Sequence, residues 1–129
     1  MKKYLLLMMM GLFSLFLGSC KSGEGVHDMT VDQFEQFIAK PDVQLVDLRS
    51  AEEFMQGHLV GAVNIDVLSA DFLDKATASL NKKQQVAVYC RSGRRSASAA
   101  RQLSKAGFKV VNLAGGITDW QVAGKKVEK

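Results

Sequence analysis

Along residues 26–129, short apolar runs alternate with segments in which apolar side chains recur at helical spacing. Several runs are rich in branched or aromatic residues and are bounded by turn residues, a pattern typical of β-strands. These predicted strands are Val43–Leu48, Ala62–Ile65, Gln85–Tyr89 and Val110–Leu113. The predicted helices open at Thr30, Ser50, Asp71, Ser96 and Ile117. Strands that alternate with helices indicate an α/β sandwich built on a mostly parallel sheet.

Local signals mark where several of these helices begin and end. Thr30-Val31-Asp32-Gln33 and Ser50-Ala51-Glu52-Glu53 both match a capping box, in which the first and fourth side chains bond to each other's backbone N–H groups. Pro41 cannot continue the first helix, and Gly57 and Gly107 supply terminating conformations for two others. The terminal stretch 125–129 is rich in lysine and is predicted to be a solvated tail.

Gln85–Tyr89 is too apolar for a half-exposed strand, so we expect a central strand covered on both faces. Cys90 follows it directly, at the carboxyl end of the sheet, where ligands bind in α/β folds. The next residues include three arginines, and a helix is predicted to start at Ser96. A cysteine in this place faces both a helix N-terminus and a cluster of cations.

These surroundings change the chemistry expected of Cys90. A free thiol has a pKa of about 8.5, and helix N-termini and cationic side chains lower it to roughly 3.5–7.5, which favours the nucleophilic thiolate. Backbone N–H groups of residues 91–96 could curl around the sulfur, with Gly93 adopting a positive φ. The arginines also attract an anionic substrate. The pattern predicts a sulfur nucleophile that attacks an anion; the alternative is an unreactive buried cysteine.

The first residues have the composition of a secretory leader. Lys2 and Lys3 precede an uncharged, mostly apolar run, Tyr4–Leu17, which is shorter than the roughly 20 residues of a membrane span. The sequence Leu17-Gly18-Ser19-Cys20 resembles the lipobox of bacterial lipoproteins. The resemblance implies a signal peptide over residues 1–19, lipidation of Cys20, a tether over 20–25 and a domain over 26–129. We then expect a lipid-anchored protein of the bacterial cell envelope that faces the periplasm or the outside; ordinary secretory cleavage beside an incidental cysteine is the alternative.

Cysteine count and charge exclude several classes of function. With Cys20 acylated, Cys90 is the only free thiol, so no intramolecular disulfide forms. His27 and His58 do not lie at ligand spacing from Cys90, so no metal site is predicted. The formal net charge is +4, and two of the lysines belong to the leader, so nothing indicates a nucleic-acid partner. No cofactor is expected.

Three stretches resemble ordered signatures of the rhodanese-like sulfurtransferases. They are "VDLRSAEEFMQGHLVGAVNI", "VAVYCRSGRRS" and "LAGGITDW", and together they extend over nearly all of the predicted domain. The resemblance implies a three-layer α/β/α sandwich with a mostly parallel sheet of about five strands. One departure is Val60, where the family usually has proline.

The resemblance also implies an active-site loop and a reaction. The loop would contain Cys90, Arg91, Ser92, Gly93, Arg94 and Arg95, followed by Ser96. Cys90 would take the outer sulfur of thiosulfate or a related anion, become a persulfide, and pass that sulfur to cyanide or a thiol. Such double displacement is covalent catalysis with ping-pong kinetics. Loop amides and guanidinium groups would stabilise the persulfide and the departing anion.

Two other functions stay open. A sulfur carrier that accepts persulfide from a partner protein would use the same loop with little turnover of its own. Phosphatases and arsenate reductases that resemble this family place five residues between cysteine and arginine, whereas four separate Cys90 from Arg95 here, which disfavours them.

The residues around the loop are expected to have supporting roles. Asp47 and Arg49 lie at a strand end that faces the same mouth. We expect them to be structural, either orienting the loop or pairing with Arg95 and Glu53, respectively. His58 is predicted to be a hydrogen-bonding turn residue rather than an acid or base.

Overall fold

The computed structural model of the protein describes residues 26–129. Its main sheet has five strands in the order β1-β6-β5-β2-β4, and every neighbouring pair is parallel. These strands are β1 (Val26–Met29), β2 (Gln44–Asp47), β4 (Val63–Asn64), β5 (Val86–Tyr89) and β6 (Val110–Leu113). The predicted leader, the tether and Cys20 lie outside the described residues.

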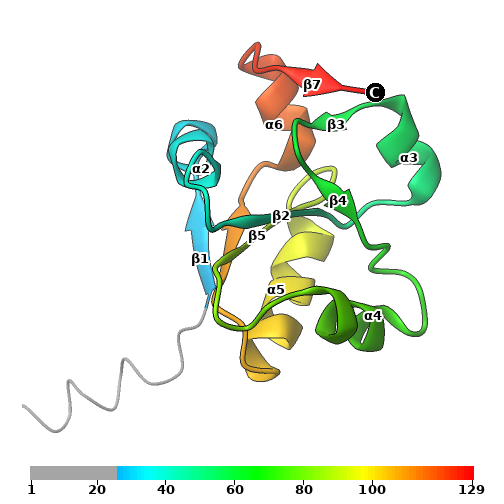
Figure 1. The fold of residues 1–129 in the computed structure, drawn as a ribbon. Helices are drawn as coiled ribbons and strands as arrows, with labels where there is room; N and C mark the ends of the chain where they lie inside the picture. Colours follow the sequence, from blue (N-terminus) through cyan, green and yellow to red (C-terminus); the bar gives the residue numbers. More distant parts are fainter. Residues whose placement is uncertain (1–25) are drawn as a thin grey trace, which may run out of the picture.

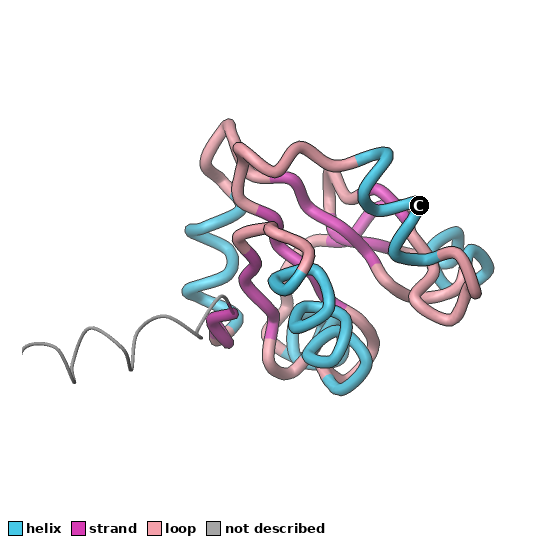
Figure 2. The backbone as a smooth tube through the Cα atoms, turned by 90° about the horizontal axis from the view of Figure 1, so that it is seen from below, coloured by secondary structure: helices cyan, strands magenta, loops and turns pink. Residues whose placement is uncertain are grey.

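Helices cover both faces of this sheet (Figures 1 and 2). They are α2 (Val31–Ile38), α3 (Ala51–Gln56), α4 (Phe72–Ser79), α5 (Arg94–Lys105) and α6 (Gly116–Val122). In Figure 1, α2 and α6 lie above the sheet, and α4 and α5 lie below it. The predicted α/β sandwich with a parallel five-stranded sheet is therefore confirmed.

The core is divided into two by the side chains of the central strand β5. Val86 and Val88 pack into a cluster with residues of α4 and α5, whereas Ala87 and Tyr89 pack into a second cluster with residues of α2 and α6. All four side chains are fully buried. The apolar character of this strand thus follows from helices on both of its faces, as expected for a parallel sheet.

Both predicted capping boxes form. The Gln33 N–H donates to Thr30 Oγ1 at 3.3 Å, and the Glu53 N–H donates to Ser50 Oγ at 3.2 Å. One helix starts earlier than predicted: α5 begins at Arg94 rather than Ser96, because Gly93 adopts a left-handed conformation and serves as its N-cap. The loop after Cys90 is correspondingly short.

A second, two-stranded antiparallel sheet pairs β3 (His58–Leu59) with β7 (Val127–Glu128). The prediction of a solvated tail over residues 125–129 was therefore wrong. Trp120 of α6 also holds this segment, since its indole N–H donates to the Lys126 carbonyl at 3.0 Å. Among the described helices, none combines the length and the apolar character that crossing a membrane requires.

Candidate active site

Cys90 follows β5 directly, and its side chain lies beneath the loop that leads into α5. The residue is only 2% exposed. Its sulfur accepts hydrogen bonds from the Gly93 N–H at 3.1 Å and from the Ser96 N–H at 3.4 Å. These donors belong to the helix N-cap and to the first turn of α5, so backbone groups with positive partial charge surround the sulfur.

The loop carbonyls are held on the opposite side by α6. Cys90 O accepts from the Ile117 N–H at 2.9 Å, and Arg91 O accepts from the Thr118 N–H at 3.1 Å. Gly116 permits this close approach, since a Cβ atom there would collide with the Arg91 carbonyl. Because these carbonyls are hydrogen-bonded to α6, the backbone N–H groups that follow them can point toward the Cys90 sulfur.

Gly93 is required by both its conformation and its surroundings. Its φ is +93°, and a Cβ atom would collide with the Ala114 carbonyl oxygen at the end of β6. A Gly93→Ala substitution should lower the free energy of unfolding by about 1–2 kcal/mol through the left-handed conformation. Overpacking should add about 1–3 kcal/mol. Urea denaturation of the two proteins measures the difference.

Gly61 provides the matched control for this substitution. Its φ is +85°, but nothing lies within 4 Å of a Cβ atom placed there. Gly61→Ala should therefore show only the conformational cost of about 1–2 kcal/mol. Equal losses for the two variants would contradict a steric role of the Ala114 carbonyl.

The pKa of the Cys90 thiol is lowered by its hydrogen bonds. Burial alone would raise this pKa, but bonds from the Ser96 side chain and from the backbone of Ser96, Gly93 and Ser92 outweigh burial. The Ser96 hydroxyl donates to the Gly93 carbonyl at 3.2 Å, and its rotatable proton can turn to the thiolate instead. Thiolate formation is thus favoured chiefly by donors of the first turn of α5 and of the loop before it.

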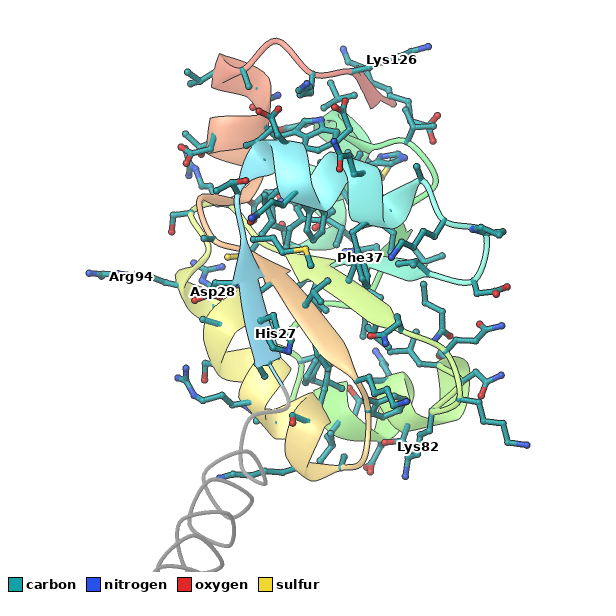
Figure 3. The ribbon with its side chains drawn as sticks, turned by 90° about the vertical axis from the view of Figure 1, so that its left-hand side faces the viewer. His27, Asp28, Phe37, Lys82, Arg94 and Lys126 are labelled. Carbon is teal, nitrogen blue, oxygen red and sulfur yellow. The ribbon has the colours of Figure 1, made fainter. Side chains whose placement is uncertain are left out.

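The arginines are not the main source of this effect. The side chains of Arg91, Arg94 and Arg95 are exposed, and the hydrogen bonds from Ser96, Gly93 and Ser92 lower the thiol pKa more than they do. Figure 3 shows Arg94 extending away from the domain. Of the two expected sources of thiol acidity, backbone N–H groups and cationic side chains, the hydrogen bonds are thus the larger. Arg91 lies in the loop, and Arg94 and Arg95 lie in the first turn of α5, where their exposed positive charges can attract an anion.

The rate at which iodoacetamide alkylates Cys90 should rise with pH through an inflection below that of an ordinary thiol, about 8.5. Ser96→Ala removes one donor to the thiolate, so its inflection should move to higher pH, because the neutral thiol is then favoured. Ser98→Ala, an exposed serine on the same helix, is the control and should leave the profile unchanged. An unshifted inflection in Ser96→Ala would contradict the role of the hydroxyl.

Asp47 and Arg49 pair with each other, so the pairing with Arg95 and Glu53, one of the two expected alternatives, does not form. Arg49 Nη2 donates to Asp47 Oδ2 at 2.8 Å, and Arg49 Nε bonds both carboxylate oxygens at 3.1 Å. Arg49 Nη2 also donates to the Gly57 carbonyl at 2.6 Å. Asp47 is fully buried and Arg49 is 7% exposed. Residues two apart in an extended chain share one face, which makes this pairing possible.

His58 contacts α3 and β7 and makes no hydrogen bond to the active-site loop among the described residues. Its Nδ1 lies 2.9 Å from the Phe54 carbonyl, and its ring stacks on the Phe54 ring at 3.8 Å. Nε2 lies 3.4 Å from Glu128 Oε1, across the pairing of β3 with β7. His58 is thus a hydrogen-bonding residue as predicted, but it lies in strand β3 and not in a turn.

A polar groove of about 400 Å³ lies beside the loop. Its lining includes Arg49, Glu53, Gln56, Arg91, Thr118 and Gln121. Sequence reasoning did not assign Gln56, Thr118 or Gln121 to the site, because α3, α6 and the loop are far apart in sequence and no local pattern marks these positions. Within residues 26–129, no group of three or more His, Cys, Asp or Glu side chains could hold a metal ion.

The rhodanese-like domain family matches the chain over residues 30–123. The protein therefore belongs to this family, as its signatures indicated. A crystal structure of a rhodanese-related protein from Thermoplasma volcanium matches the fold with a TM-score of 0.71 and 26% identity, over 79% of this chain and 97% of that one.

Two curated relatives relate the family to sulfur chemistry. Thiosulfate sulfurtransferase PspE of Escherichia coli (strain K12) is 39% identical over 74 residues, covering 57% of this chain and 70% of PspE. YrkF of Bacillus subtilis (strain 168), named as a candidate sulfur carrier protein, is 31% identical over 104 residues. That match covers 79% of this chain but only 55% of YrkF. These relatives support a rhodanese-family role in sulfur transfer.

Proposed function

We propose that Cys90 transfers sulfane sulfur from a small anionic donor of the thiosulfate type to a thiophilic acceptor. The Cys90 thiolate attacks the outer sulfur of thiosulfate, the sulfur–sulfur bond of the donor breaks, and sulfite leaves with the bonding electron pair. The resulting persulfide then gives its outer sulfur to cyanide or a thiol, and the thiolate is restored. No cofactor takes part in these steps.

The observation that carries this proposal is the cradle around the sulfur. Amide N–H groups 3.1 and 3.4 Å away stabilise negative charge on Cys90 Sγ, and the same donors are available to a persulfide. Arg91, Arg94 and Arg95 border this loop and are free to attract the donor and stabilise the departing sulfite. A similar reaction is named for the relative PspE.

Intact mass after incubation with thiosulfate tests the first half-reaction. The full-length protein should gain the mass of one sulfur atom, and reduction with dithiothreitol should remove it. The adduct should be absent from a Cys90→Ser variant and present in Cys20→Ser, which changes the only other cysteine of the chain. A protein that gains no sulfur, or that gains it without Cys90, would overturn the proposal.

The name of YrkF supports a second candidate, a sulfur carrier that is loaded and unloaded by partner proteins. The two functions share the Cys90 persulfide and differ in turnover. With thiosulfate and cyanide, an enzyme forms thiocyanate repeatedly, whereas a carrier forms the adduct and then releases little product. Robust hydrolysis of a phosphate ester would instead favour the third function, a phosphatase.

We also propose that Cys20 is lipidated and anchors the protein to the bacterial cell envelope, facing the periplasm or the outside. The support is the sequence alone: basic residues, an apolar run and a lipobox-like stretch, all outside the described residues. Expression of the full chain should place it in the membrane fraction, and Cys20→Ala should release it. Membrane attachment that persists in Cys20→Ala would overturn the proposal.

A further inference from the structure

Arg49 presents an unused donor to the groove beside the active-site loop. Its Nε and Nη2 atoms are occupied by Asp47 and the Gly57 carbonyl, and Nη1 has no hydrogen-bond partner among the described residues. Nη1 is not sealed from solvent, because Asn112 Oδ1 is the only fully buried side-chain polar atom without a partner in residues 26–129. Since Arg49 is 7% exposed and lines the groove, its free donor is available there.

Glu53 contributes an unused acceptor to the same groove. Its Oε1 atom accepts bonds from Ser50 N at 3.4 Å and Ser50 Oγ at 3.1 Å within the capping box of α3. Its Oε2 atom has no hydrogen-bond partner among the described residues, and the side chain is half-buried at the groove. A carboxylate oxygen in this position suits an ammonium group.

The side chains at the groove carry no net charge when Asp47 is counted together with its partner Arg49. Arg49 is neutralised by Asp47, and Arg91 and Glu53 are both free of ion pairs within the described residues. A dianion such as thiosulfate gains from Arg91 but is repelled by Glu53. A small molecule that carries one carboxylate and one ammonium group can satisfy Arg91, Arg49 Nη1 and Glu53 together.

We propose that this groove binds the sulfur acceptor and selects small thiols that carry both a carboxylate and an ammonium group, as an amino-acid thiol does. The inference rests on the proposed sulfur transfer and names its acceptor class. Arg91 directly follows Cys90, and Thr118, another lining residue, binds the Arg91 carbonyl, so the groove adjoins the lip of the loop. The proposal requires that a thiol bound in this groove reach past Arg91 to the outer sulfur of the Cys90 persulfide, since Arg91 is the groove residue next to Cys90.

The step at this site balances without an added oxidant or reductant. The acceptor loses its thiol proton to solvent, and its thiolate forms a bond to the outer sulfur of the Cys90 persulfide. The sulfur–sulfur bond of that persulfide breaks, and its electron pair returns to Cys90 Sγ. The acceptor leaves as a small-molecule persulfide, and Cys90 is again a thiolate.

Four thiols test the charge requirement with the full-length protein and thiosulfate as donor. Cysteine has both charges, cysteamine only the ammonium, 3-mercaptopropionate only the carboxylate, and 2-mercaptoethanol neither. Values of kcat/KM are compared per thiolate and are divided by the rate constant of the same thiolate with a small-molecule disulfide, which corrects for both the ionised fraction and the intrinsic nucleophilicity. Cysteine should exceed each of the others by about tenfold or more, as expected for a charge-assisted hydrogen bond at each end.

Two variants test which side chain binds the ammonium group of the acceptor and which binds its carboxylate. Glu53→Gln keeps the capping box, because glutamine also serves at this position, and should reduce the preference for cysteine over 3-mercaptopropionate by about tenfold. Arg91→Gln should reduce the preference for cysteine over cysteamine. Glu52→Gln, an exposed neighbour on α3 outside the groove lining, is the control and should leave both ratios unchanged.

Cyanide as a parallel acceptor separates the two proposals. If cyanide is turned over but all four thiols react equally per thiolate, the acceptor groove is overturned and the proposed sulfur transfer stands. A cysteine preference that survives Glu53→Gln unchanged also overturns the groove. If neither an adduct nor turnover with cyanide is found, the proposed function itself fails.

Discussion

A Cys90→Ser variant should lose thiosulfate-dependent turnover down to the uncatalysed background. The hydroxyl of serine is far less acidic than a thiol and does not accept sulfane sulfur, so neither half-reaction can proceed. Removal of a covalent nucleophile costs on the order of a millionfold in kcat in a serine protease, which sets the scale of the expected loss. Thiocyanate formation from thiosulfate and cyanide is the measurement.

The variant should keep its fold, because serine fills nearly the same space beneath the loop and can accept from the Gly93 and Ser96 amides. Urea denaturation checks this. Cys20→Ser serves as the control and should retain wild-type turnover, since the reaction is assigned to the loop of Cys90. Residual activity of Cys90→Ser above background would show that another group carries the sulfur.

An Asp47→Asn variant should lose about 3–5 kcal/mol of unfolding free energy, because it leaves the Arg49 guanidinium buried without its carboxylate. Asp47 is fully buried, and three hydrogen bonds from the Arg49 side chain converge on it. The measurement is the urea dependence of unfolding at neutral pH. Asp74→Asn, an exposed carboxylate on α4, is the control and should change stability by less than about 0.5 kcal/mol.

A double variant distinguishes an ion pair from two independent contributions. If the two charges act as a pair, Asp47→Leu combined with Arg49→Met should cost less than the sum of the two single substitutions, because no unpaired charge stays buried. Additive losses would contradict this interpretation and would show that each side chain stabilises the fold through separate contacts.

The parts of the site that the sequence predicted are those that are contiguous in the chain. An apolar run, then Cys90, then a glycine and a helix start describe one strand and one loop, and their geometry follows from local rules. Gly93 was expected to have a positive φ, and it has one. The two capping boxes were likewise readable, because each is complete within four residues.

Contacts between distant segments were not predictable in the same way. Strand β1 presents His27 and Asp28 to solvent at the edge of the sheet and so lacks the apolar run of a buried strand. Strands β3 and β7 have two residues each, and their pairing joins residues 58–59 to residues 127–128. No periodicity can develop over such short elements, so only tertiary packing defines them.

Sequence reasoning also gave too much weight to side-chain charge as the cause of the lowered Cys90 pKa, and the reason is physical. Charged side chains can be identified directly from the sequence, so three arginines near Cys90 led to the prediction that guanidinium groups lower the thiol pKa. Backbone amides carry no sequence signature, and whether they converge on an atom depends on φ and ψ angles. Here the amides of Gly93 and Ser96 reach the sulfur while the arginine side chains remain exposed.

The hydrogen bonds from Ile117 and Thr118 to the loop carbonyls link the reactivity of Cys90 to the C-terminal part of the chain. During synthesis, a nascent polypeptide that has emerged only as far as Gly107 already contains the cysteine but not the helix that orients its loop. Such an intermediate carries an unactivated sulfhydryl. The low pKa of the Cys90 thiol therefore requires that α6 has been made and has packed against the loop.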